Sequence, residues 1–257
     1  MLVVISPAKR LDWDGARAPE TQPEFLKEAG ILAGHARQLS LSGLKGLMGL
    51  SDDLARLNRD RFRAFDAEPA PDAVRSAAHA FAGDTYMGLE AKTLDDDALR
   101  WAQDRLRILS GLYGALRPLD AIQPYRLEMG SRLATRRGKT LYDFWGDRIA
   151  QKLREDAKAV GATVLLNCAS QEYFGAVPPK ALGLRIVTPQ FLETRDGKAR
   201  MVSFFAKKAR GAMARHVIEH RLTDVEEIKG FDHGGYRFDP DRSEADTWAF
   251  VRDYPES

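Results

Sequence analysis

Apolar residues follow several distinct patterns along this chain, and each pattern predicts one kind of element. Leu2–Ile5 is an apolar run of four residues ended by Ser-Pro, which predicts a short buried strand. Apolar residues recur every three or four positions over residues 23–39, which predicts a helix. Residues 163–168 (TVLLNC) are β-branched and apolar and predict a central strand.

Residues 41–62 have helical spacing with one interruption. Leu44 and Leu47 fit a first helix, Gly49 interrupts it, and Ser51 can cap a second helix that includes Leu54. We therefore predict two helices joined by a tight turn.

The rest of the chain contains both kinds of pattern. Helices are predicted over residues 95–105, 141–159 and 205–222, the edge of a strand at 107–109, and weak strands at 236–238 and 248–251. Asp196-Gly197 separates two predicted strands, 184–192 and 199–205, which indicates a hairpin. Thr223 and Glu226 match a capping box that would open a short helix.

Helices and strands are thus mixed without regular alternation, and no internal repeat or linker-like tract occurs. We predict a mixed α/β (α+β) fold, a single compact domain over residues 1–257 with a mixed sheet, a helical N-terminal portion and a basic cleft. A second domain boundary near Ala70 is the alternative.

Composition favours a cytoplasmic protein without a membrane partner. Hydrophobic residues make up 44% and charged residues 30%, as in globular proteins, and no run approaches the ~18 apolar residues of a membrane span. The apolar patch at the N-terminus is shorter than the core of a signal peptide. Cys168 is the single cysteine, which excludes an internal disulfide and a cysteine-rich metal site.

The net charge of +2 is small, but basic residues cluster at 132–139 and 207–215. A nearly neutral protein can still present a basic cleft to a polyanion. Solvated helix faces of mixed charge are the alternative for either cluster.

The stretch 106–130 (LRILSGLYGALRPLDAIQPYRLEMG) is too rich in Gly and Pro for one helix or strand, which indicates a shaped loop. Its polar side chains could point into a cleft; they are Tyr113, Arg117, Asp120, Gln123, Tyr125, Arg126 and Glu128. A buried connector held by its own salt bridges is the alternative.

Two basic groups lie at predicted element ends. Lys9 follows the first strand, where it could bind a phosphate or act as a nucleophile, or could be an ordinary surface lysine. Lys207, Lys208 and Arg210 open a helix, where positive charge opposes the helix dipole, so an anion site is favoured there. Arg215 shares a helix face with Lys208.

The turn within residues 41–65 is similar to a helix-hairpin-helix, with core pattern h-x-G-h-G-x-x-x-A. Leu47, Gly49, Leu50 and Ala55 fit, and Ser51 replaces the second Gly. Backbone N–H groups of such a hairpin bind a DNA phosphate without reading sequence. Asp52 and Asp53 would repel phosphate unless turned away, and a plain helical hairpin is the alternative.

Metal and cofactor signals are weak. No GxxxxGK[ST], GxGxxG or GxSxG pattern occurs, and His216 and His220 have the spacing of a chelating pair without a recognisable third ligand. We therefore predict no metal and no cofactor. Asn167, Ser170, Glu172 and Tyr173 follow the central strand, where either a cleft or a simple strand-end turn would form.

Six segments in order resemble the YaaA family of bacterial peroxide-stress proteins. They are SPAK (6–9), FAGDTYMGL (81–89), the stretch 106–130, LYDFWG (141–146), NCASQEYF (167–174) and SFFAKKARGAMAR (203–215). The resemblance covers essentially the whole chain. Arg10, where Thr is expected, and the His216/His220 pair depart from the family pattern.

The resemblance implies a cytoplasmic protein that helps cells survive hydrogen peroxide by keeping free iron low, which limits Fenton damage. It also implies DNA binding through a basic cleft and the hairpin, and no established catalytic activity. The cleft candidates that it implies are Lys9, Asp84, Tyr86, Tyr113, Arg117, Arg126, Glu128, Lys207, Lys208 and Arg210.

We therefore predict a monomer that binds duplex or distorted DNA largely independently of sequence. The predicted contacts are Lys9, Gly49, Ser51, Arg117, Arg126, Lys207, Lys208, Arg210 and Arg215, beside a cleft formed by Tyr86, Tyr113, Tyr125, Asn167 and Glu172.

Two alternatives remain. The first is an enzyme on nucleic acid or nucleotides, like a lyase or glycosylase, in which Lys9 or Lys207 forms a Schiff base and Glu128 or Asp84 moves a proton. The second is direct iron sequestration, for which the sequence offers no recognisable ligand set.

Overall fold

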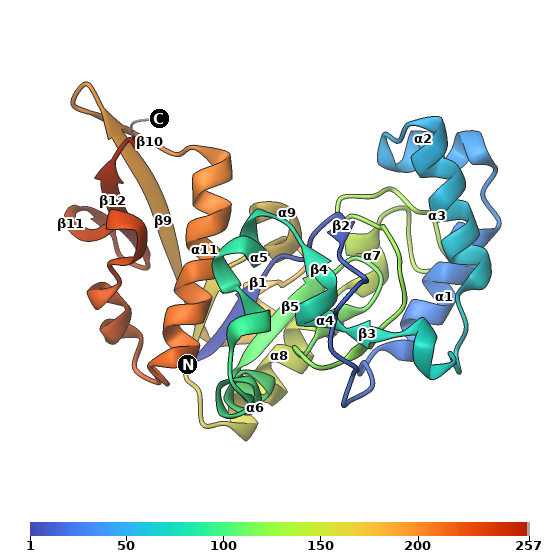
Figure 1. The fold of residues 1–257 in the computed structure, drawn as a ribbon, viewed down its shortest axis with the longest axis horizontal. Helices are drawn as coiled ribbons and strands as arrows, with labels where there is room; N and C mark the ends of the chain where they lie inside the picture. Colours follow the sequence, from blue (N-terminus) through green and yellow to red (C-terminus); the bar gives the residue numbers. More distant parts are fainter. Residues whose placement is uncertain (256–257) are drawn as a thin grey trace.

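A mixed sheet of eight strands is the centre of the computed structural model, which describes residues 1–255 (Figure 1). The order is β11-β12-β9-β8-β1-β5-β6, and β10 pairs with the end of β9. The strands are β1 (Leu2–Ile5), β5 (Leu106–Ser110), β6 (Gly114–Leu116), β8 (Val164–Cys168), β9 (Arg185–Arg195), β10 (Lys198–Arg200), β11 (Arg237–Glu244) and β12 (Thr247–Asp253). The predicted mixed α/β class is confirmed; the last two residues of the predicted unit lie outside the described residues.

The middle of the sheet is parallel. β5, β1, β8, β9 and β12 pair in parallel with their neighbours, whereas β6, β10 and β11 add antiparallel strands. β1 is buried along its whole length, in agreement with its unbroken apolar sequence, because a parallel sheet is covered on both faces.

Helices cover the two faces of this sheet. α5 (Asp84–Leu89) and α11 (Ser203–Glu219) lie in front of it in Figure 1, and α8 (Arg148–Ala159) lies behind it. α6 (Asp96–Arg105) contacts both α11 and α8, and α7 (Leu141–Trp145) precedes α8.

The predicted helical N-terminal portion is confirmed as α1 (Leu26–Arg37), α2 (Leu41–Met48) and α3 (Asp52–Ala64), at one end of the molecule (Figure 1). The Gln123 side chain donates to the Asp66 carbonyl (2.7 Å) and accepts from the Asp66 N–H (2.9 Å). This pair of hydrogen bonds joins the end of the helical portion to the loop after β7 (Ala121–Ile122).

Short elements complete the chain. They are β2 (Arg10–Leu11), β3 (Arg75–Ser76), α4 (Ala77–Ala80), β4 (Phe81–Ala82), α9 (Gln171–Phe174) and α10 (Pro179–Leu182), with 3-10 turns at Pro71–Ala73, Ala91–Thr93, Val225–Gly230 and His233–Gly235.

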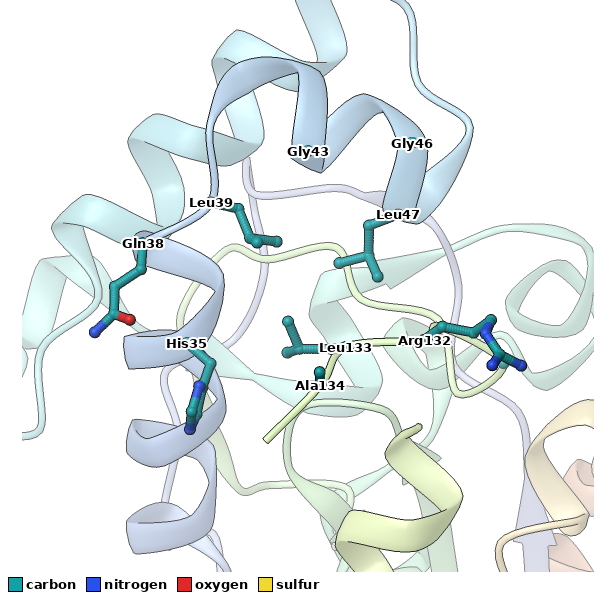
Figure 2. Close-up of a pocket in the computed structure, with 10 residues that line it drawn as sticks. His35, Gln38, Leu39, Gly43, Gly46, Leu47, Arg132, Leu133 and Ala134 are labelled. Atoms are coloured by element: carbon teal, nitrogen blue, oxygen red, sulfur yellow. The ribbon is translucent and has the colours of Figure 1, made fainter. Parts of the chain in front are cut away.

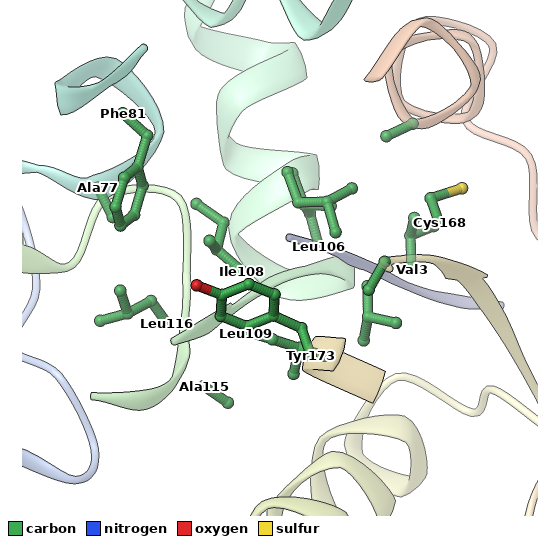
Figure 3. Packing of buried hydrophobic residues seen from close by; sticks show 14 of the residues in the cluster. Val3, Ala77, Phe81, Leu106, Ile108, Leu109, Ala115, Leu116, Cys168 and Tyr173 are labelled. Carbon is green, nitrogen blue, oxygen red and sulfur yellow. The ribbon is translucent and has the colours of Figure 1, made fainter. Parts of the chain in front are cut away.

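The core runs from the sheet into the layers on both faces. Figure 3 shows Val3, Leu106 and Ile108 of adjacent strands beside Phe81 and Tyr173, which come from the connections. All five are less than a tenth exposed. The short elements β4 and α9, which contain Phe81 and Tyr173, are therefore fixed by core packing.

Three local predictions were wrong. The helix over 141–159 breaks at Gly146 (φ 50°), a backbone conformation that continues no right-handed helix, and so becomes α7 and α8. The strand over 199–205 stops at Arg200, and α11 begins at Ser203. The capping box uses Asp224 with Glu227, one residue after the predicted pair.

Candidate nucleic-acid interface

The strand order reverses between β1 and β8. β1 leads to β5 on one side, and β8 leads to β9 on the other. Ser6 and Ser170 follow these two strands, and the Ser170 N–H donates to the Ser6 hydroxyl oxygen at 2.9 Å. In open α/β sheets, a crevice beyond the carboxyl ends of the strands at such a switch point is the usual place for a ligand.

Lys9 lies beside this point and forms an ion pair with Glu128. Its Nζ is 3.3 Å from Glu128 Oε1, and the same oxygen accepts from Arg126 Nε (3.0 Å) and Nη2 (2.9 Å). The Lys9 side chain is 65% exposed, whereas those of Arg126 and Glu128 are mostly buried. Lys9 therefore presents its charge to solvent above a buried Arg–Glu pair.

Helix α5 brings a second ion pair to the same edge. The Tyr86 hydroxyl donates to the Ser6 carbonyl (3.2 Å), and Gly83 faces Ala8 so closely that an added Cβ would lie 3.2 Å from the Ala8 Cβ. Asp84 follows Gly83, and its Oδ2 is 3.8 Å from Lys207 Nζ on α11. The Lys207 side chain is 53% exposed, and Lys208 is also exposed.

Two glycines allow this arrangement of α5 and α11. A Cβ on Gly88 would lie 2.0 Å from the Lys208 carbonyl oxygen, and one on Gly211 would lie 1.8 Å from that of Thr85. Any side chain at either position would force the helices apart. The close crossing fixes the first turn of α11, with its lysines, over α5.

Three predicted cleft tyrosines are buried, so burial raises the pKa of each phenol above its ordinary value. Tyr125 forms a 2.6 Å hydrogen bond with Ser110, and the Tyr113 oxygen accepts from the Gln123 N–H (3.1 Å). Tyr125 lines a small cavity of about 10 Å³ beside Lys9 and Glu128. Tyr113 lies deeper and supports the loop.

Asn167 at the end of β8 and Glu172 after it serve local structure. Glu172 Oε1 accepts from the Gly130 N–H (3.0 Å), so it holds the end of the loop that contains Glu128. Asn167 is buried, and its side-chain oxygen accepts from the Ala169 N–H (3.1 Å). Neither side chain pairs with a cleft arginine.

Three predicted cations are held away from this edge or within the protein: Arg117 and Arg215, which form ion pairs, and Arg210, which is half-buried. Arg117 pairs with Asp120 (2.9 Å) and donates to the Gln22 carbonyl. Arg215 pairs with Glu219 (2.7 Å) and Glu90 (3.8 Å) and donates to the Leu89 carbonyl, which ties α11 to the end of α5.

Arg210 is half-buried, and burial lowers the pKa of its guanidinium. Burial also raises the pKa of the nearby Cys168 thiol to about 12, although the positive charge of Arg210 opposes that rise.

Helices α2 and α3 are joined by the predicted tight turn. Gly49 adopts a left-handed conformation (φ 62°) after α2, and the Ser51 hydroxyl caps α3 by accepting from the Leu54 N–H. Lys45 pairs with Asp52 across the turn, so one of the two hairpin carboxylates is neutralised.

A cavity of about 770 Å³ lies behind the hairpin, between α1, α2 and residues 130–134 (Figure 2). Leu39, Leu47 and Leu133 point into it, and Arg132 lies at its margin. Gly43 and Gly46 on α2 widen it because they carry no side chains.

A basic pocket of about 340 Å³ lies at the β9–β10 hairpin, lined by Arg195, Lys198, Arg200 and Tyr254 together with Glu193, Asp196 and Val202, and it has no counterpart among the predicted sites. One signal could have shown it. After the predicted Asp196-Gly197 turn, Lys198 and Arg200 stand at alternate positions, which places them on one face of a strand, and Arg195 precedes the turn.

Within residues 1–255, no group of three or more His, Cys, Asp or Glu side chains is arranged to hold a metal ion. The helices of the same range include none with the length and apolarity that a membrane crossing requires.

Comparison with known proteins gives a consistent result. Residues 1–242 match the model of the family described as "Peroxide stress protein YaaA". The chain belongs to this family. It is 64% identical to a UPF0246 protein of Roseobacter denitrificans, with 100% of both chains covered, and 61% identical to one of Ruegeria pomeroyi, with 99% of both covered. A UPF0246 protein of Caulobacter vibrioides is 52% identical, with 99% of this chain and 100% of the relative covered.

Proposed function

We propose that this peroxide-stress family member binds DNA through the phosphate backbone, largely independently of sequence. The observation that carries the proposal is the position of Lys9, Lys207 and Lys208. All three are exposed, and the contacts of Ser6, Gly83 and Asp84 connect their elements at one edge of the sheet.

Local charge supports an anionic ligand. Lys9, Lys207 and Lys208 face solvent with the partly buried Arg126 and Arg210 behind them, against the carboxylates of Asp84, Glu128 and Glu172. Five cations and three anions leave a positive excess. A phosphate could then replace Asp84 or Glu128 as the partner of a lysine, and such contacts carry no sequence information.

The α2–α3 hairpin would supply a second phosphate contact through backbone N–H groups near Gly49 and Ser51. The Lys45–Asp52 pair supports this role because it reduces the negative charge at the turn. Asp53 opposes it. We therefore assign the larger share of binding to the lysines.

A salt titration of the affinity for duplex DNA tests the proposal. The logarithm of the binding constant should fall linearly with the logarithm of salt concentration, by about 0.9 for each phosphate neutralised. Replacing both lysines by alanine (Lys207→Ala/Lys208→Ala) should reduce the slope of this salt dependence by about 1.8. A binding constant that does not change with salt would contradict the proposal.

We further propose a cytoplasmic role in which DNA binding limits Fenton damage. Cations condense on DNA phosphates, and a protein whose lysines neutralise phosphates releases them. Fe²⁺ on DNA would be released in the same way, so peroxide would generate fewer radicals beside the strand. Plasmid nicking by Fe²⁺ and hydrogen peroxide should fall with added protein and fall less with Lys207→Ala/Lys208→Ala. Equal protection by both proteins would contradict this role.

A second candidate function is supported by the buried oxygen of Glu128. Glu128 Oε2 has no hydrogen-bond partner among residues 1–255, and Glu128 lines the small cavity beside Lys9. Lys9 Nζ could attack the C1′ aldehyde of an abasic site and, with loss of water, form a Schiff base. Glu128 or Asp84 would then accept the C2′ proton as the 3′ phosphate leaves.

The exposure of Lys9 argues for the phosphate role over this one, because Schiff-base lysines usually lie in apolar pockets. Borohydride trapping with abasic-site DNA separates the two. A covalent adduct that is absent in Lys9→Ala would establish the lyase. If no adduct forms and Lys9→Ala processes DNA as the parent does, the lyase is excluded.

A further inference from the structure

The β9–β10 hairpin places two cations directly opposite each other. Lys198 is the Cα partner of Arg195 in the antiparallel ladder, and Arg200 lies two residues along, on the same face as Lys198. None of the three has a carboxylate oxygen within 4 Å among residues 1–255. Like charges in opposed positions destabilise a sheet, so an anionic ligand would relieve a cost that the free protein carries.

The carboxylates near these cations do not neutralise them. Glu193, the Cα partner of Arg200, is 1% exposed; it accepts from the Val202 N–H (3.0 Å) and the Tyr236 hydroxyl. Asp196 also lines the pocket, at the turn, and has no cationic nitrogen within 4 Å among residues 1–255. The pocket of about 340 Å³ that these side chains line is therefore basic at its surface.

Aromatic side chains lie beside the cations. Tyr254 lines the pocket, is 39% exposed and has the Arg195 guanidinium 5.4 Å from its ring centre. Phe205 contacts Tyr254 (5.8 Å between ring centroids), and Phe204, which is 47% exposed, follows at 5.4 Å from Phe205. Two aromatic rings are thus partly exposed to solvent, and the Arg195 guanidinium covers one face of the Tyr254 ring.

This surface continues onto the proposed DNA site. Phe204 lies in the first turn of α11, three and four residues before Lys207 and Lys208, which places the three side chains on neighbouring positions of one helix face. Figure 1 shows the hairpin and the first turn of α11 at the same end of the molecule.

We propose that the β9–β10 hairpin, with Tyr254 and Phe204, binds a single-stranded segment of nucleic acid next to the DNA held by Lys207 and Lys208. Lys198 and Arg200 contact the phosphates, and unstacked bases lie against Tyr254 and Phe204. Exposed rings between cations favour this ligand over an acidic peptide, because bases stack on aromatic faces and carboxylates do not. The inference rests on the proposed DNA binding and adds the kind of DNA: a duplex with an unpaired end, flap or gap.

The test compares three labelled probes by fluorescence anisotropy: a blunt duplex, the same duplex with a single-stranded thymidine tail, and the tail alone. The tail should tighten binding to the parent protein. Tyr254→Ala should abolish most of that gain, about tenfold for one lost base stack, and leave the blunt duplex unchanged. Tyr254→Phe should keep the gain, because the ring and not the hydroxyl is used.

The cations are tested with Lys198→Ala/Arg200→Ala, which should lower the salt slope for the tail by about 1.4. Arg154→Ala/Lys158→Ala on α8 removes two other exposed cations and serves as the matched control, with no expected effect on the tail. Circular dichroism checks that every variant is folded.

Each outcome decides something. Blunt-duplex binding without any gain from the tail would overturn this inference and leave the proposed function standing. If the protein binds the single-stranded tail but not the blunt duplex, the hairpin site is supported and the proposed binding of duplex DNA is overturned. Tyr254→Ala could keep both the affinity for the blunt duplex and the gain from the tail, and polyglutamate could displace the tail equally from the parent and the variant. That result would identify a surface that binds any anion and would overturn base stacking. No binding to any probe would overturn both proposals.

Discussion

Gly88 of α5 and Gly211 of α11 each face the backbone of the opposite helix, so that neither position has room for a Cβ. The contact matters for the candidate site because Asp84 begins α5 and Lys207 lies in the first turns of α11. Their separation of 3.8 Å depends on how closely the two helices cross.

We expect Gly211→Ala to destabilise the protein. The new Cβ would lie 1.8 Å from the Thr85 carbonyl oxygen, and overpacking of this kind costs about 1–3 kcal/mol or more of unfolding free energy. Gly34→Ala in α1 is the matched control, since nothing lies within 4 Å of its Cβ position and alanine favours a helix by about 1 kcal/mol. Urea unfolding measures both; equal stability of the two variants would contradict the close crossing.

Asp84→Asn and Lys207→Ala should change DNA affinity in opposite directions. Loss of the carboxylate frees the Lys207 charge, and an exposed pair of this kind is worth about 0.5–1 kcal/mol, or roughly twofold to fivefold in affinity. Lys207→Ala should weaken binding and lower the salt slope by about 0.9. Anisotropy titrations with one duplex compare the two. A weaker affinity in Asp84→Asn would show that the carboxylate itself contacts the ligand.

Cys168 should not react with peroxide in the folded protein. The thiolate is the reactive form, and burial raises the pKa of this thiol to about 12, so the thiolate is rare near neutral pH. Iodoacetamide should modify the native protein far more slowly than the urea-unfolded protein. Cys168→Ala should bind DNA as the parent does. Rapid oxidation of the native thiol by hydrogen peroxide would contradict this account.

Stability should fall as the solution becomes mildly acidic. Burial, with help from the charges of Arg17 and Lys92, lowers the pKa of His79, whose Nδ1 lies 2.8 Å from the Ser76 hydroxyl. The unfolded chain therefore binds the proton first, at its ordinary pKa of about 6.5. The contribution of His79 to stability is complete above that pH and is lost as the pH falls toward the lower folded pKa.

One such proton changes the unfolding free energy by at most about 1.4 kcal/mol per pH unit. His79→Gln should make the dependence between about pH 7 and 5 shallower without removing it, because burial and His220 also lower the pKa of His216. Urea unfolding at a series of pH values measures the slope. An unchanged slope of unfolding free energy against pH in His79→Gln would show that other groups cause the acid sensitivity.

Local patterns predicted the elements well and the partners of side chains poorly. The unbroken apolar run of β1, the apolar first three residues of β8 and the spacing in α1 are properties of neighbouring residues, so they are visible in sequence. The break at Gly146 was missed because the apolar spacing continues across it.

Side-chain partners depend on distant residues. Arg215 has the right helical position for a shared basic face with Lys208, but Glu90 and the Leu89 carbonyl on α5 bind it. Those partners lie 125 and 126 residues earlier in the chain. The spacing of residues does not predict the pairing of Lys9 with Glu128 either, because the path of the loop after β7 brings Glu128 to Lys9.

The placement of β1 also affects the protein while it is being made. Among the described residues 1–255, its sheet partners are β5 and β8, which end at Ser110 and Cys168. At ribosomal rates of about 5–20 residues per second, roughly 8–34 s pass before the second partner has been synthesised. Throughout that interval at least one edge of this apolar strand lacks its partner, which makes the nascent chain a candidate client for chaperones that hold emerging polypeptides.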